Sequence, residues 1–145
     1  MSLALATSLP PLSFLAFDFG TRRVGVASGN SLTRTATPVT TLALQGAARL
    51  AAIGALVDEW QPAALVVGVP FHPDGAAHVN TERARRFARE LRARFGLTVH
   101  EVDERYTTTA AKSAGSADLD AAAAAIILEQ HLSSLASSAE DGSAG

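Results

Sequence analysis

The sequence contains no cysteine, and only 18% of its residues are charged. Without cysteine, neither a disulfide nor a thiolate zinc site can form. No apolar segment approaches the roughly 20 residues needed to cross a bilayer, which argues against membrane insertion. Hydrophobic residues make up 48% of the chain, which excludes wholesale disorder and favours a well-buried α/β core.

The two ends of the chain differ in composition from its middle. Residues 1–11 lack a basic segment and carry a short apolar run broken by prolines, so they predict a disordered leader rather than a secretory signal. Residues 133–145 are mostly small and predict a disordered tail. Residues 12–132 remain, a length that suits one domain. We therefore expect a cytoplasmic protein with one core and no membrane partner.

The formal net charge of −2 at first argues against a polyanionic partner, but the charges are unevenly distributed. Six of the eleven arginines lie between Arg83 and Arg94. Glu82 and Glu90 can pair with Arg86 and Arg94 at helical spacing, which favours a solvated helix face. A basic face that follows a nucleic-acid backbone is the alternative.

Short apolar segments separated by turn residues predict three strands, followed by alternating helices and strands. The two connections between the first three strands are short and favour an antiparallel meander, to which right-handed crossovers add two parallel strands. The resulting order, βββαβαβα, predicts an α/β fold of the ribonuclease H-like class, a mixed five-stranded sheet with flanking helices. Trp60 and Phe87 are expected in its core. The predicted strands are Phe14–Phe19, Arg22–Ser28, Thr35–Leu42, Ala63–Val69 and Leu97–Val102, and the predicted helices are Gln45–Trp60, Asn80 or Thr81 to Phe95, and Asp120–Leu132.

Three carboxylates stand at the ends of predicted elements. Asp18 closes a buried apolar run, where a desolvated carboxylate is unstable without a cation or several hydrogen-bond donors. Glu104 follows the predicted strand that ends at Val102, and Asp120 begins an alanine-rich helix. Such acids from separate elements suggest a divalent metal site. The alternatives are a turn-capping role for Asp18 and an ordinary helix N-cap for Asp120.

Four motifs occur in one order along the chain. They are Phe17-Asp18-Phe19-Gly20-Thr21-Arg22-Arg23-Val24-Gly25-Val26-Ala27, then Val67-Gly68-Val69-Pro70 with Asp74-Gly75, then Asp103-Glu104-Arg105 followed by threonines, and finally Asp120 ahead of Ala124-Ala125-Ile126-Ile127-Leu128-Glu129. Together they closely resemble the YqgF family, also called RuvX, bacterial proteins described as Holliday-junction resolvases and as pre-16S ribosomal RNA nucleases. The resemblance covers about Leu12 to Leu132.

The resemblance implies a ribonuclease H-like fold and a metal-dependent nuclease that hydrolyses phosphodiester bonds. By motif position, the family's catalytic and metal-binding acids correspond to Asp18, Glu104 and Asp120. Asp103 is an alternative to Glu104, because neighbouring strand residues point to opposite faces and a one-residue error changes the choice. The fifteen residues between Glu104 and Asp120 carry only two basic side chains, where the family usually has a longer and more basic segment.

Hydrolysis of a phosphodiester bond needs an activated water and neutralisation of charge in the transition state. Two divalent ions can meet both demands. Oxygen ligands, without cysteine or an evident histidine triad, suit Mg²⁺ or Mn²⁺ better than zinc. Asp18 is expected to bridge the ions, with Glu104 and Asp120 each holding one side.

Several polar residues near these acids are predicted to contact nucleic acid. Thr21 with Arg22 or Arg23 can bind a phosphate, and Arg105 can hold substrate or neutralise the acids. The four histidines are scattered and are expected to be ordinary surface or half-buried residues, with a general base at His72 as the alternative.

Two other functions compete with the nuclease interpretation. Actin-like ATPases share the Asp-x-Gly-Thr turn, but they need two such domains and this chain has the length of one. A catalytically silent nucleic-acid-binding module is the stronger alternative, because the short segment after Glu104 is consistent with lost activity. Within the nuclease interpretation, the substrate is the 5′ end of pre-16S rRNA, a Holliday junction, or both. Junction resolution would require a homodimer.

Overall fold

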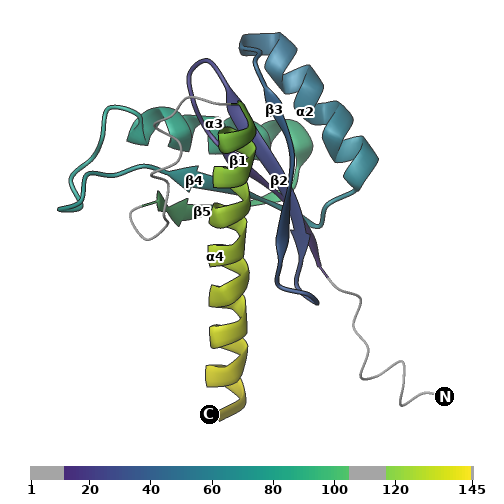
Figure 1. Ribbon diagram of the computed structural model, residues 1–145, viewed down its shortest axis with the longest axis vertical. Coiled ribbons are helices and arrows are strands. Elements are labelled where there is room, and N and C mark those ends of the chain that lie inside the picture. The colour runs from purple at the N-terminus through teal and green to yellow at the C-terminus, as the bar shows by residue number, and fades with distance from the viewer. Residues whose placement is uncertain (1–11, 105–116, 145) are drawn as a thin grey trace.

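The computed structural model describes residues 12–104 and 117–144, and a five-stranded sheet forms its centre (Figure 1). Its strands lie in the order β3-β2-β1-β4-β5. β1 pairs antiparallel with β2, and β2 with β3, whereas β1, β4 and β5 are parallel. This confirms the predicted mixed sheet. The strands are β1 (Ser13–Asp18), β2 (Val24–Asn30), β3 (Ala36–Leu42), β4 (Ala64–Val69) and β5 (Thr98–Asp103).

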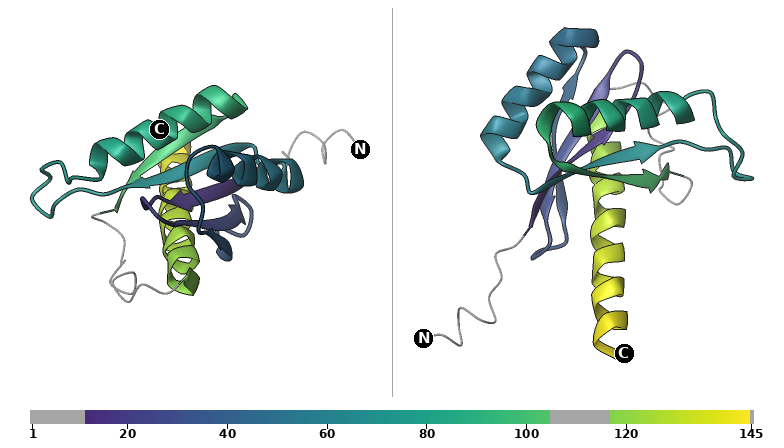
Figure 2. Two further views of the ribbon diagram at one scale, coloured as in Figure 1. Left: turned by 90° about the horizontal axis from the view of Figure 1, so that it is seen from above. Right: turned by 180° about the vertical axis from the view of Figure 1, so that it is seen from behind.

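Helices cover both faces of the sheet. α2 (Gly46–Trp60) and α3 (Thr81–Phe95) lie on one face, and α4 (Ala117–Ala144) crosses the other (Figure 2). Alternation along the central strands supplies apolar side chains to both layers. The cluster on the side of α2 and α3 includes Leu15, Phe17, Leu65, Val67, Ile53, Phe87 and Leu91, and the cluster under α4 includes Phe14, Ala16, Val66, Val102, Ile127 and Leu128.

Of the two aromatic residues expected in the core, Phe87 lies there and Trp60 does not. Phe87 is buried between α3 and the sheet, as expected. The Trp60 side chain is 41% exposed, because it is the last residue of α2 and the helix ends there, before Gln61 and the buried Pro62. The prediction that Trp60 belongs to the core is therefore wrong.

The last helix is longer than predicted at both ends. It begins at Ala117 rather than Asp120, and it continues beyond Leu132 to Ala144, through most of the segment that we expected to form a disordered tail. The reason is that Ala, Ser, Leu and Glu follow one another here without proline, and the first glycine is Gly142. The predicted leader, residues 1–11, lies outside the described residues. Among the helices that the structure describes, none is long and apolar enough to cross a membrane.

Candidate functional site

Asp18 is the last residue of β1 and is 1% exposed. It pairs with Gly25 of β2 on one side and with Gly68 of β4 on the other. Paired residues of neighbouring strands present the same face of a sheet. Asp18 lies two and four residues beyond Ala16 and Phe14, which pack under α4, so its side chain belongs to the α4 face.

Gly25 allows α4 to come close to this end of the sheet. A Cβ atom at Gly25 would lie 1.9 Å from the backbone oxygen of Asp120, a distance that no real side chain could occupy. The missing side chain thus permits direct contact between the backbones of β2 and α4. It brings the first turn of α4, with Asp120, against the residue that pairs with Asp18.

Gly68 does the same for Glu104 on the other side of Asp18. A Cβ atom at Gly68 would lie 2.8 Å from Glu104 Oε1 and 3.1 Å from its Cγ. The Glu104 side chain therefore folds back from the end of β5 over the glycine that pairs with Asp18. Asp103 pairs with Val69, one residue further along β4, and so occupies a register position of the opposite face.

Asp120 forms an ion pair instead of capping its helix. It is the fourth residue of α4, so the alternative interpretation of Asp120 as the N-cap is wrong. Its Oδ2 atom lies 2.9 Å from Arg23 Nε, in the loop that connects β1 to β2. Near a helix N-terminus a carboxylate is also favoured by the helix dipole. Arg23, which was expected to contact a phosphate, is thus placed to hold Asp120.

The three acids lie at the same end of the sheet, but their side chains do not form a complete set of metal ligands in this arrangement. Asp18 Oδ2, Glu104 Oε1 and Asp120 Oδ2 are all buried from solvent. Among residues 12–104 and 117–144, no three acidic or histidine side chains lie close enough, as they stand, to hold one metal ion together. The donor chemistry fits Mg²⁺ or Mn²⁺, because every candidate ligand is a carboxylate oxygen. Binding would require these side chains, including the Asp120 carboxylate now facing Arg23, to adjust.

The loop after Asp18 is anchored by a buried arginine that the sequence analysis did not single out. Arg49 in α2 is 6% exposed, and its Nη2 donates a hydrogen bond to the carbonyl oxygen of Thr21 over 3.2 Å. Its Nε donates to Leu44 O over 2.7 Å. The signal was an arginine at an inward position within the otherwise apolar run from Gly46 to Val57. Thr21 and Arg22 are exposed, and Arg105 lies outside the described residues.

Comparison with known proteins assigns the family. A family model described as "RuvX: Holliday junction resolvase" matches residues 12–134. The chain belongs to the RuvX family. A curated relative from Polaromonas sp. is 64% identical over 137 residues, covering 93% of this chain and 99% of the relative. Another from Albidiferax ferrireducens is 63% identical over 123 residues, covering 85% of this chain and 79% of the relative. Both carry the name "Putative pre-16S rRNA nuclease".

Solved structures similar to this RuvX chain confirm the predicted ribonuclease H-like fold. The Thermus thermophilus RuvC structure has a TM-score of 0.52 at 13% identity, with 87% of this chain and 97% of that chain covered. The T. thermophilus RuvC structure in complex with a Holliday junction substrate has a TM-score of 0.51 at 15% identity, with 83% of this chain and 93% of that chain covered. At these identities the similarity concerns the fold.

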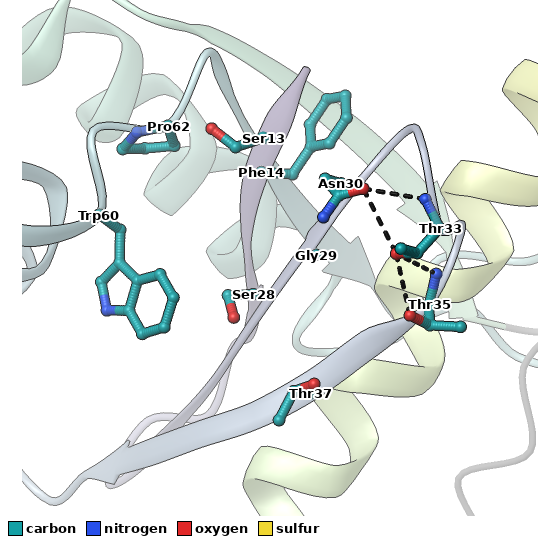
Figure 3. Close-up of a pocket in the computed structure, with 10 residues that line it drawn as sticks. All are labelled: Ser13, Phe14, Ser28, Gly29, Asn30, Thr33, Thr35, Thr37, Trp60 and Pro62. Atoms are coloured by element: carbon teal, nitrogen blue, oxygen red, sulfur yellow. Dashed lines mark hydrogen bonds between the residues drawn. The ribbon is translucent and has the colours of Figure 1, made fainter. Parts of the chain in front are cut away.

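A cleft of about 210 Å³ lies at the far end of the sheet from the acids (Figure 3). It is lined by Ser13, Phe14, Ser28, Gly29, Asn30, Thr33, Thr35, Thr37, Trp60 and Pro62. Ser13 and Asp18 are five residues apart on β1, which corresponds to about 16 Å at the usual strand rise. The described residues that line this cleft include no acid or base, so they do not supply the groups that phosphodiester chemistry needs.

The histidines of the RuvX chain form two pairs. His72 and His78 lie in the loop after β4, with ring centroids 5.0 Å apart. His100 of β5 and His131 of α4 have ring centroids 4.5 Å apart, and the edge of Phe14 meets His131. His131 is 8% exposed, and its Nε2 has no hydrogen-bond partner among the described residues. Burial, aided by His100, lowers the pKa of His131 below its ordinary value.

This buried histidine predicts a loss of stability in mild acid. Because its pKa is lowered in the folded protein, the unfolded chain takes up an extra proton as the pH falls below about 6.5, and folding becomes less favourable. The melting temperature of the wild-type protein should fall more between pH 7.5 and pH 5.5 than that of a His131→Leu variant. The exposed His72 is the matched control, and equal pH slopes for His131→Leu and His72→Leu would contradict the assignment.

Proposed function

We propose that this RuvX-family protein is a metal-dependent nuclease in which Asp18, Glu104 and Asp120 hold Mg²⁺ or Mn²⁺. The protein is a hydrolase acting on phosphodiester bonds. The observation that supports the site is the pair of glycines beside Asp18. Gly25 and Gly68 flank Asp18 in register on the two adjacent strands, and the other two acids approach across them. Glycine weakens the interior of a strand, so two glycines on either side of one residue are best explained by another group that must come close to the sheet.

Each residue has a distinct task in the proposed reaction. Bound metal ions would activate water and neutralise charge on the phosphate. Asp18, between the other two acids, supplies the central carboxylate, and Glu104 and Asp120 supply one on either side. Arg23 balances the charge of Asp120 and keeps its carboxylate at this end of the sheet.

The exposed loop contributes to substrate binding. Thr21 and Arg22 lie on the surface three and four residues after Asp18, where hydroxyl and guanidinium groups can contact phosphate oxygens. Arg49 holds the backbone of Thr21, so this loop is fixed relative to the acids. Arg105, which directly follows Glu104 in sequence, remains a predicted contact.

The first substrate that we propose is precursor 16S rRNA, because relatives more than 60% identical to this chain are named as pre-16S rRNA nucleases. Cleavage at its 5′ end is part of our proposal. Such an activity belongs in the cytoplasm. Holliday-junction resolution is the second candidate, supported by the description of the family model. It would need two active sites facing two strands, and hence a symmetric homodimer.

Comparison of Glu104→Gln with Asp103→Asn tests whether Glu104 is a metal ligand of the site. We expect this variant to lose at least about 100-fold in manganese-dependent cleavage, since it removes one ligand charge from the site. Asp103→Asn is the matched control, because Asp103 occupies a register position of the opposite face, and it should retain cleavage within a few fold. The assay compares labelled precursor rRNA, single-stranded DNA and junction DNA in the presence of manganese.

The same assay decides between the enzyme and a silent binding module. If the wild-type protein binds these nucleic acids but cleaves none of them in manganese or magnesium, the module interpretation replaces the nuclease. If Asp103→Asn lost cleavage and Glu104→Gln retained it, Asp103 and not Glu104 would be the ligand. The cleaved substrate, together with the mass of the protein in solution, separates rRNA processing from junction resolution.

A further inference from the structure

A second cleft begins at the residue after Asp18, on the other face of the sheet. Asp18 faces α4, and the next residue, Phe19, packs with the cluster on the side of α2 and α3. The cleft lies between α2 and α3, which share that face (Figure 2), and it has a volume of about 240 Å³. It is lined by Phe19, Gly46, Arg49, Leu50, Arg83, Arg86, Phe87 and Glu90.

Five of the six arginines of α3 fall into two groups. Arg89 pairs with Glu82 at 2.6 Å, and Arg85 and Arg92 pair with Glu101 of β5 at 3.4 and 3.2 Å. The expected pairing of Glu82 with Arg86 is therefore wrong, because Glu82 turns to Arg89 instead. In the part of the chain that the structure describes, the two arginines of the cleft, Arg83 and Arg86, form no ion pair.

Arg49 adds a third guanidinium to the cleft from the opposite wall. Burial lowers the pKa of Arg49 and Glu90 opposes this shift, yet arginine remains charged under all ordinary conditions. Its guanidinium lies 5.6 Å from the centre of the Phe19 ring. Of its five N–H donors, the hydrogen bonds to Leu44 and Thr21 use two. Glu90 is the acid among the described lining residues, so the cleft has three cations and one anion.

We propose that this cleft binds a backbone phosphate of the nucleic-acid substrate, next to the phosphate that is cleaved. Guanidinium groups are suited to phosphate because their planar forks donate paired hydrogen bonds. Phe19 lines the cleft and directly follows Asp18 in the chain, so the cleft and the acids lie at the same end of β1, on opposite faces of the sheet. A strand that crosses the end of β1 thus passes from the acids to the arginines. The inference rests on the proposed nuclease function and adds the path of the strand.

The test compares two double variants of the same helix. Arg83→Gln/Arg86→Gln removes the two cleft arginines of α3, and Arg85→Gln/Arg89→Gln removes two that pair with acids. Both variants lose the same formal charge from the same element. Binding of labelled single-stranded RNA is measured by fluorescence anisotropy in EDTA, where no metal-dependent cleavage occurs, over a range of salt concentrations.

We expect Arg83→Gln/Arg86→Gln to weaken binding at least about 10-fold and to reduce the salt slope by about 0.7, the contribution of one lost phosphate contact on a single strand. Arg85→Gln/Arg89→Gln should weaken binding less than about 3-fold. A third variant, Glu90→Gln, removes the acid of the cleft and should tighten binding. This gain does not depend on the folding of the arginine variants.

The outcomes separate this inference from the function on which it rests. Equal losses in the two double variants, or no gain in Glu90→Gln, would overturn the cleft as a phosphate site while leaving the nuclease intact. Failure of the wild-type protein to bind any RNA or DNA would overturn both. Melting temperatures of all variants verify that the measured losses come from binding.

Discussion

Replacement of Asp18 by asparagine is expected to lower metal-dependent cleavage about 1,000-fold and to abolish the stabilisation that manganese gives to the wild-type protein. A thousandfold loss corresponds to about 4 kcal/mol of transition-state stabilisation, a reasonable amount for loss of the central ligand of a metal site. At a manganese concentration 100-fold above its dissociation constant, the wild-type protein should gain about 2.7 kcal/mol. In a domain of this size, that gain raises the melting temperature by about 5 to 10 °C.

Thermal unfolding with and without manganese measures the second effect independently of any substrate. Without metal, Asp18→Asn should melt no lower than the wild-type protein, because it removes one buried negative charge from a cluster of acids. Asp58→Asn, the same chemical change on the exposed surface of α2, is the matched control and should keep both the stabilisation and the cleavage. A manganese-induced shift of equal size in Asp18→Asn and wild type would exclude Asp18 as a ligand.

Gly25→Ala is expected to destabilise the fold by at least about 3 kcal/mol, beyond the usual cost of an overpacked side chain, and to abolish cleavage. The added Cβ would lie 1.9 Å from Asp120 O, and neither backbone can move without separating α4 from β2. The acids of the site would separate with them. Denaturant unfolding measures the stability, and the manganese-dependent assay measures the activity.

Gly54→Ala is the matched control for this change. Gly54 lies inside α2, and a Cβ there would be 3.5 Å from the Phe95 ring, an ordinary contact. Alanine is the better helix former, so this variant should gain up to about 1 kcal/mol in stability and keep its activity. If Gly25→Ala were as stable and active as wild type, close contact of α4 with β2 would not be what assembles the site.

Local patterns were sufficient to predict most of the elements. Turn residues and apolar periodicity located all five strands and the helices over residues 46–60 and 81–95 to within one or two residues. The errors occurred where a local signal was weak. The small residues after Leu132 continue the helix because they include no proline and no early glycine. Trp60 is exposed because it is the last residue of α2.

The candidate site could be predicted in its residue types but not in its assembly. Asp18, Glu104 and Asp120 were identified from their motifs and their positions at the ends of elements. Their relation to Gly25 and Gly68 depends on strand register, which links residues far apart in the chain. The buried Arg49 was missed for the same reason. One of its partners, Thr21, lies in the loop between β1 and β2, and the other, Leu44, lies between β3 and α2.

Composition, periodicity and motif order thus establish the class of fold and the family resemblance and predict the three acids, since these properties depend on short stretches of the chain. Only the folded protein decides that Glu104 shares a face with Asp18, that Asp120 faces Arg23, and that two of the arginines in α3 line a cleft while their neighbours pair with acids. The physical reason is that these contacts depend on how closely the backbones of different elements approach one another in the folded protein. Two glycines without side chains permit that contact.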